Sequence, residues 1–175
     1  MQQVKWFDRK FNFDTTDNIF PSLLVRLEGT PIRLRHYIST LENSVAEVKP
    51  AGTWSVKEHL GHLTDLEPLW QGRLVDILSG SDYLRDADLE NTQTHEAQHN
   101  IRPLPELIAD FERERERTLS SLRRLHRSDI HKASRHPRLN TNLTIQNLFQ
   151  FVAEHDDHHL VSITEIARMM VPSES

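Results

Sequence analysis

The chain of 175 residues contains no cysteine, and this absence excludes several kinds of chemistry at once. Without thiols the chain has no disulfide, no thiolate zinc site and no cysteine nucleophile. Histidine and carboxylate side chains are then left as metal ligands. Any metal site in this protein must therefore be built from imidazoles and carboxylates.

Long apolar runs are also missing. No stretch approaches the roughly 20 apolar residues of a membrane-spanning helix, and the charged, aromatic segment from Trp6 to Asp14 does not resemble a signal peptide. The 21 basic and 26 acidic residues give a net charge of −5, without the clusters of Lys and Arg that nucleic-acid binding requires. We expect a cytoplasmic protein with neither a membrane nor a nucleic acid as its partner.

Glycine is scarce, at five residues, and alternating apolar runs typical of strands are few. Apolar residues recur instead at steps of three and four, which predicts an all-α fold. We expect a single domain over 1–175, in which an arm at 1–20 packs its aromatic side chains on a helical bundle at 21–170. The helices of this predicted four-helix bundle, with two longer irregular connections at 80–104 and 127–143, cover 21–48, 55–79, 105–125 and 144–170.

Local signals mark several helix ends and breaks. Ser55 and Glu58 have the spacing of a capping box, and Thr144 is a suitable N-cap for the last helix. The Gly29-Thr30-Pro31 run predicts either a kink or two helices, with Thr30 capping the second. Pro68 predicts a bend within the second helix.

The last predicted helix carries two histidines where its buried face calls for leucines. An imidazole without a partner costs free energy in an apolar core, and two adjacent ones cost more. Residues at i and i+4 lie one turn apart on the same side of a helix, so both rings can bind one ion. The stripe of this inward face runs Leu148, Val152, His155, His159, Ile163, Ile166 and Met170.

Two histidines hold a metal ion weakly, so we expect a third ligand on a facing helix. His62 lies two turns into the second helix, a suitable depth, but His59 is one turn earlier and is also within reach. Periodicity alone favours His62 only slightly. The candidates on this helix are Glu58, His59, His62, Asp65 and Glu67.

Two motifs of this chain together resemble those of the DinB/YfiT-like family of metal-binding four-helix bundles. The resemblance covers about residues 21–170. Its motifs are Trp54-Ser55-x-x-Glu58-x-Leu60-x-His62-Leu63-x-Asp65 and Glu154-His155-x-x-His158-His159-Leu160-x-x-Ile163.

The resemblance implies a three-histidine site made by His62, His155 and His159, with one divalent ion, zinc or nickel in the first place, and water in the open positions. The family includes transferases that deliver bacillithiol, mycothiol or glutathione to electrophiles, and a thiol-dependent isomerase. Many other members have no known activity. The resemblance therefore implies a metal more strongly than it implies a reaction.

Other polar residues near these motifs have two interpretations each. Asp65 is the best candidate for orienting a ligand ring through its free N–H, whereas His158, one residue off the stripe, either supports the site or faces solvent. His95, His99 and Asn100 either line the mouth of a pocket or form a polar surface loop, which is the more common outcome.

Two further charged segments are interpreted most simply as solvent-exposed surface. The His136-Pro137-Arg138 segment is a surface loop in the simplest interpretation, although Arg138 is able to bind an anionic group of a substrate. The alternating run from Glu112 to Arg117 is predicted to be a solvated face.

Two classes of function follow from these residues. The first is a metal-dependent enzyme with a small-molecule substrate, either a transferase using a low-molecular-weight thiol or a hydrolase using metal-bound water. The alternative is a non-catalytic metal-containing binding or stress-response module. Asp65, Glu58 and His158 are the candidates for a general base, whose presence near the ion separates the two classes. A homodimer is left open.

Metal binding requires neutral imidazoles, and the unperturbed pKa of histidine is about 6.5. On that value, a chelator lowers the melting temperature at pH 7.5 and has much less effect at pH 5.

Overall fold

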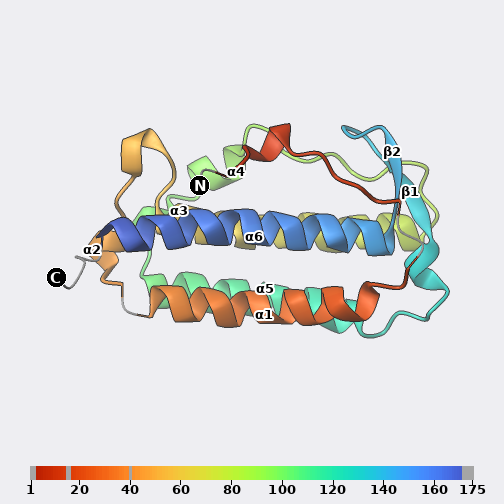
Figure 1. The fold of residues 1–175 in the computed structure, drawn as a ribbon, viewed down its shortest axis with the longest axis horizontal. Helices are drawn as coiled ribbons and strands as arrows, with labels where there is room; N and C mark the ends of the chain where they lie inside the picture. The colour runs from red at the N-terminus through yellow and green to blue at the C-terminus, as the bar shows by residue number, and fades with distance from the viewer. Residues whose placement is uncertain (1–2, 15–16, 40, 171–175) are drawn as a thin grey trace.

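The computed structural model describes residues 3–14, 17–39 and 41–170. Its four long helices pack as a bundle in which α1 and α3 each contact both α5 and α6 (Figure 1). The prediction of a helical bundle is confirmed. Within the described residues, no helix combines the length and the apolar character needed to cross a membrane. The long helices are α1 (Phe20–Ile38), α3 (Val56–Leu78), α5 (Leu104–Leu122) and α6 (Ile145–Met170).

The first predicted helix is shorter than expected and is followed by the short α2 (Asn43–Ala46). The helix α1 runs through Pro31 without a break, so the alternative of two helices with Thr30 as a cap is wrong. Proline removes one helical hydrogen bond, but Leu27 and Leu34 on either side are fully buried. Tertiary packing of this face outweighs the local preference for a break.

The capping signals of the other helices are confirmed. Ser55 accepts a hydrogen bond from the backbone N–H of Glu58, whose side chain bonds back to the Ser55 N–H. Thr144 accepts one from the backbone N–H of Asn147 at 3.1 Å. The helix α3 contains Pro68 within its span, and the bend predicted there stays a prediction.

The connections contain more structure than the sequence indicates. Residues 127–143 were expected to be irregular, yet they include most of an antiparallel hairpin in which Ala133 pairs with Thr144 and His136 with Thr141. Strand formation depends on contacts with the partner strand, so strands of four residues are not predicted from their own sequence. The short elements are β1 (Ala133–His136), β2 (Thr141–Thr144), α4 (Thr92–Glu96) and single 3-10 turns at Trp6–Asp8, Pro50–Gly52, His99–Ile101 and Asp129–His131.

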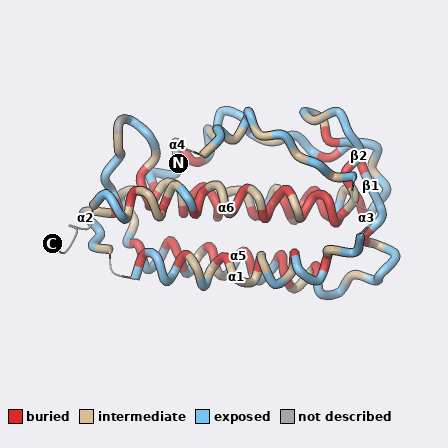
Figure 2. Tube along the Cα trace, in the orientation of Figure 1, coloured by how far each residue is buried: buried red, intermediate tan, exposed pale blue. Residues whose placement is uncertain are grey.

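The buried residues form two apolar clusters along the bundle. Figure 2 shows buried segments alternating with more exposed ones along the long helices. One cluster includes Phe20, Trp70 and Phe149 on the side of the hairpin, and the other includes Leu60 and Phe111 on the side of α2.

A buried charged cluster, made by Glu67, Arg115 and Asp156 with the hydroxyls of Thr30 and Thr118, joins all four long helices. The Arg115 Nη2 atom lies 2.6 Å from Glu67 Oε1, and its Nη1 atom lies 2.5 Å from Asp156 Oδ2. The side chain of Arg115 is 1% exposed, so the predicted solvated face does not extend to this residue. Its two carboxylate partners lie on other helices, which local charge alternation cannot indicate.

Candidate metal centre

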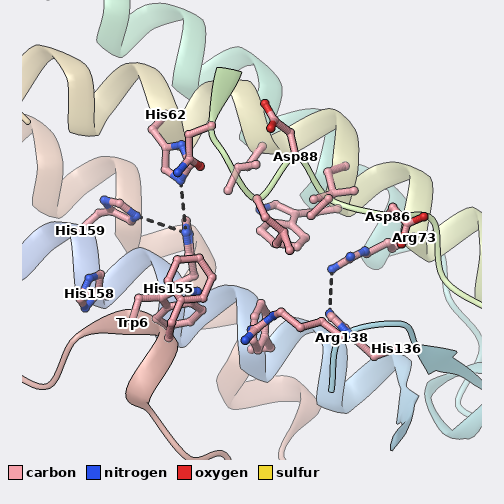
Figure 3. Close-up of a pocket in the computed structure, with 18 of the residues that line it drawn as sticks. Trp6, His62, Arg73, Asp86, Asp88, His136, Arg138, His155, His158 and His159 are labelled. Atoms are coloured by element: carbon pink, nitrogen blue, oxygen red, sulfur yellow. Dashed lines mark hydrogen bonds between the residues drawn. The ribbon is translucent and has the colours of Figure 1, made fainter. Parts of the chain in front are cut away.

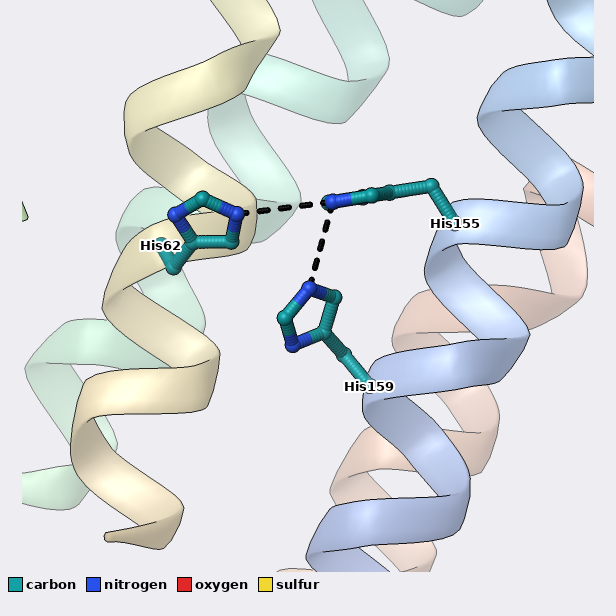
Figure 4. A group of neighbouring side chains, drawn as sticks. All are labelled: His62, His155 and His159. Carbon is teal, nitrogen blue, oxygen red and sulfur yellow. Dashed lines mark hydrogen bonds between the residues drawn. The ribbon is translucent and has the colours of Figure 1, made fainter. Parts of the chain in front are cut away.

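Three imidazoles meet between α3 and α6, and they are the ones that the sequence singled out (Figure 4). His155 and His159 lie one turn apart on α6, and His62 faces them from α3. The His155 Nε2 atom is 3.2 Å from His159 Nε2 and 3.4 Å from His62 Nε2. All three rings are buried and could hold a metal ion, because one ligand atom of each lies within 4.8 Å of the others.

These distances match what a small tetrahedral cation requires. Two nitrogens that each lie about 2.0–2.1 Å from zinc are separated by about 3.3–3.4 Å along the edge of the tetrahedron. The two Nε2···Nε2 distances at His155 are close to this edge. The donor set therefore fits a divalent ion without any rearrangement of these two contacts.

The protonation of the rings also favours a cation. Burial lowers the pKa of His62 to about 3, and burial together with the neighbouring imidazoles lowers the pKa of His155 and His159 well below 6.5. The rings are thus neutral at physiological pH, with one lone pair each. Neutral imidazoles are the form that binds metal ions.

His62 is oriented by a short chain of hydrogen bonds on its outer side. The Thr94 hydroxyl donates to Asp65 Oδ2 at 2.8 Å and lies 3.1 Å from His62 Nδ1. Because its single proton is directed at Asp65, the hydroxyl accepts from the Nδ1–H of His62, and the Nε2 lone pair faces the other rings. Asp65 thus acts on the ring through Thr94 and not by direct contact.

Asp65 has a second partner in His99, whose Nε2 atom lies 2.9 Å from Oδ2. The His99 ring is buried against Gly61, where an added Cβ would lie 2.2 Å from it. Glycine is therefore required at position 61 for this approach. The expectation of a polar surface loop is wrong for His99, because tertiary packing carries it onto α3.

His59 does not join the three rings but lies behind one of them. Its Nδ1 atom is 2.8 Å from His159 Nδ1, so one of the two nitrogens donates to the other. With the proton on His159 Nδ1, the Nε2 lone pair of that ring faces His155 and His62. At least one of the three Nε2 atoms then lacks a hydrogen-bond donor, since His155 carries one proton at most there.

The three rings lie at the wall of a cavity of about 330 Å³ (Figure 3). Apolar side chains form much of this wall, among them Trp6, Trp54, Trp70 and Phe151. The N-terminal arm closes one side, because the Trp6 ring packs edge-on against His155 with ring centroids 4.9 Å apart. Arg9 holds the arm to α6 through an ion pair with Glu154 at 3.2 Å.

The structure separates the remaining candidates by their position. His158 lines the cavity beside Trp6, and its buried Nδ1 atom has no hydrogen-bond partner among the described residues. Glu58 is committed to the capping box and to Lys49, 2.5 Å away. His95 is exposed, and Asn100 accepts a hydrogen bond from Ser55.

The other end of the cavity contains residues that the sequence analysis undervalued or missed. His136 and Arg138 both line it, although a surface loop was the simplest interpretation. The sequence patterns missed two residues: Arg73, which lies at this end, and Thr94, which lies behind His62 and does not line the cavity. Arg73 had a signal, because it follows His62 by eleven residues, about three helical turns, and so lies on the same face of α3. Thr94 had none.

Comparisons with known proteins agree with this architecture. The family model described as the DinB superfamily matches residues 26–163. Among solved structures, YfiT from Bacillus subtilis, described as a probable metal-dependent hydrolase with an unusual four-helix bundle topology, superposes with a TM-score of 0.80. The two sequences are 21% identical, and the alignment covers 93% of each chain. No curated protein matches the chain in sequence.

Proposed function

The chain belongs to the DinB superfamily, and from that premise we propose that it is a metal-dependent enzyme for small molecules, whose ion is held by His62, His155 and His159. The observation that carries the proposal is the convergence of three buried, neutral imidazoles at the wall of an apolar cavity. A site intended only for structure is closed by a fourth protein ligand. Among the described residues, no fourth ligand joins these three rings.

The ion, zinc or nickel in the first place, would supply a positive charge that lowers the pKa of a thiol or of water and makes a nucleophile near neutral pH. The chain supplies the surroundings of that nucleophile. Trp6, Trp54 and Phe151 exclude bulk water from the wall next to the rings, which strengthens electrostatic interactions inside the cavity.

His158 is the general-base candidate that lies at the cavity. Its pKa is lowered by burial and by the charge of Arg9, so the ring is neutral and able to accept a proton. Asp65 and Glu58 do not line the cavity, and each is bound to other partners. We therefore assign proton acceptance to His158.

Two nucleophiles are compatible with this arrangement. An external low-molecular-weight thiol is the first candidate, because the cavity wall is largely apolar and the chain has no cysteine of its own. Water is the second, and the description of YfiT as a probable metal-dependent hydrolase supports it. In both cases the electrophile is a small molecule that enters the same cavity.

Metal content tests the ligand set. We expect about one divalent ion per chain by elemental analysis, and a near-complete loss of it in His62→Ala, His155→Ala and His159→Ala. The matched controls are His158→Ala, at the cavity, and His95→Ala, on the surface, and both should keep the ion. Loss of the ion in His59→Ala but not in His62→Ala would overturn the assignment.

Activity tests the reaction. Metal-loaded protein, incubated with monochlorobimane and a panel of low-molecular-weight thiols, should form a conjugate with at least one thiol, and the His155→Ala variant should not. Hydrolysis of a panel of small esters and amides tests the second nucleophile. A fully loaded protein without either activity would contradict the enzyme and favour a non-catalytic binding module.

A further inference from the structure

The end of the cavity away from the three histidines contains a buried arginine without an acidic partner. Arg73 is 2% exposed, and its guanidinium lies over the Trp70 ring, 5.6 Å from the centroid. No carboxylate within the described ranges lies at ion-pair distance from it, in contrast to Arg115. Burial lowers its pKa to about 10, so it is charged at neutral pH. Asp76 and Asp86 act on this charge, but only from beyond ion-pair distance. A buried charge without a counter-ion in contact is costly, and an anionic ligand in contact reduces that cost.

The hydrogen bonds of Arg73 leave part of its donor capacity free. Its Nε atom donates to the Arg85 carbonyl oxygen at 3.1 Å, and its Nη1 atom lies 3.1 Å from His136 Nε2. A guanidinium has five N–H donors and no acceptor. Its hydrogen bonds use Nε and Nη1, and no described residue accepts a hydrogen bond from its Nη2 atom.

His136 cannot satisfy both of the donors that face it. The backbone N–H of Leu139 points at its Nδ1 atom from 3.2 Å, and Arg73 faces its Nε2 atom. Burial and the charge of Arg73 lower the pKa of His136 to about 4, so the ring is neutral and accepts at one nitrogen only. In either tautomer one donor faces another N–H. An oxygen acceptor from a ligand relieves this conflict.

The position of Arg73 relative to the histidines defines the shape of such a ligand. His62 and Arg73 are eleven residues apart on one face of α3, which corresponds to about 16 Å along the helix axis. Leu66 and Leu69 line the wall between them. Arg138 adds a second positive charge on the exposed side, and the exposed Asp86 partly offsets the charge of Arg73 (Figure 3).

We infer that Arg73, with His136 and Arg138, binds the carboxylate of a substrate whose apolar middle follows the leucines and whose reactive end reaches the three histidines. This inference deepens the proposed function by naming a substrate class, an elongated apolar carboxylic acid. The anion end is built from residues outside the metal ligands, so it can be tested without the ion.

The test uses chelator-treated, full-length protein, because a carboxylate could otherwise bind the metal. Octanoate and octanamide serve as probes with the same chain and different head groups, and binding is followed by calorimetry and by the fluorescence of the tryptophans in the cavity wall. A charge-assisted hydrogen-bond pair predicts that octanoate binds about tenfold or more tighter than octanamide. The Arg73→Gln variant should lose that preference.

Two further variants keep the result interpretable. Arg138→Gln, at an exposed position, should weaken octanoate binding by a smaller factor. Arg135→Gln removes the same charge from the exposed face of β1, where the side chain bonds Asn140 outside the cavity, and should bind like the parent protein.

Equal binding of octanoate and octanamide, or an unchanged preference in Arg73→Gln, would overturn the inference. Displacement of octanoate by an equal concentration of inorganic phosphate would show a general anion site and also overturn it. Metal content measured on untreated samples of the same preparations distinguishes these outcomes from failure of the proposed function.

Discussion

Two buried polar clusters share the helices α3 and α6, and their polar groups are satisfied in opposite ways. In the charged cluster, Arg115 is shared by Glu67 and Asp156, and hydroxyl groups complete each carboxylate: Thr118 donates to Glu67, and Thr30 donates to Asp156 at 2.9 Å. None of its side-chain atoms is left without a partner among the described residues.

The histidine cluster is built in the other way. Its rings are uncharged, and the nitrogens that face one another at His155 cannot all be satisfied by the protons available. On its outer side, Thr94 bonds His62 and His59 bonds His159, whereas the buried Nδ1 atom of His155 has no hydrogen-bond partner among the described residues. A polar cluster with all its hydrogen bonds made inside the protein stabilises a fold, whereas a cluster with two of its three rings held from outside and unsatisfied nitrogens at its centre is organised for a ligand.

The largest effect is expected from breaking the charged cluster. Arg115→Met leaves two buried carboxylates facing each other without a cation, which should lower the free energy of unfolding by about 3–5 kcal/mol. Burial, opposed by Arg115, already raises the pKa of Glu67. Chemical denaturation measures the change.

The control for this variant is Arg113→Met on the same helix, because Arg113 is exposed and pairs with Asp110 at the surface. Its effect should stay below about 1 kcal/mol. Equal losses in the two variants would mean that the charged cluster does not contribute to stability as a unit.

A smaller effect is expected when the histidine cluster loses its ion. A chelator should remove about 3 kcal/mol of stability, if the ion is present at a hundred times its dissociation constant. Burial lowers the pKa of the rings, to about 3 for His62, so the rings stay neutral at pH values well below 6.5. The effect of the chelator should therefore persist at pH 5 and fade as the pH approaches 3. Burial therefore predicts a larger chelator effect at pH 5 than the unperturbed pKa of histidine does.

In the metal-free protein, the same low pKa values make the free energy of unfolding depend on pH. The unfolded rings titrate near 6.5, but the folded ones do so lower, so the unfolded state binds more protons below pH 6.5. Stability is therefore complete above about pH 6.5 and decreases as the pH falls toward 3. Melting curves with and without chelator at several pH values measure both effects. A chelator effect that vanishes at pH 5 would contradict the burial of the rings.

The smallest effect concerns the outer side of the histidine cluster. Thr94→Val removes the hydroxyl between His62 and Asp65 and should weaken metal affinity by about ten- to a hundredfold, the usual effect of losing such a partner. Thr94→Ser keeps the hydroxyl and should retain most of the metal affinity. If Thr94 acted only through the packing of its methyl group, Thr94→Ser would lose affinity and Thr94→Val would keep it. Thr92→Val, at an exposed position of α4, is the control. Calorimetric titration of the metal-free variants measures the affinities.

Much of the helical framework was determined by the sequence itself. Periodicity and the capping signals at Ser55 and Thr144 located four long helices, and the i, i+4 spacing placed His155 and His159 on one buried face. These features depend on neighbours within one or two turns, which is the range over which a helix imposes its own geometry.

The tertiary structure decided which helix faces meet and at what height along the bundle. Periodicity favoured His62 over His59 only slightly, because both lie near the same side of α3, and the packing of α3 on α6 brings His62 to the pair. Three further features depend on segments far apart in sequence. They are the burial of Arg115, the position of Thr94 behind His62, and the contact of Arg73 with His136. The sequence of one helix does not determine how its partner is rotated and shifted relative to it, because the packing of all four helices sets these quantities.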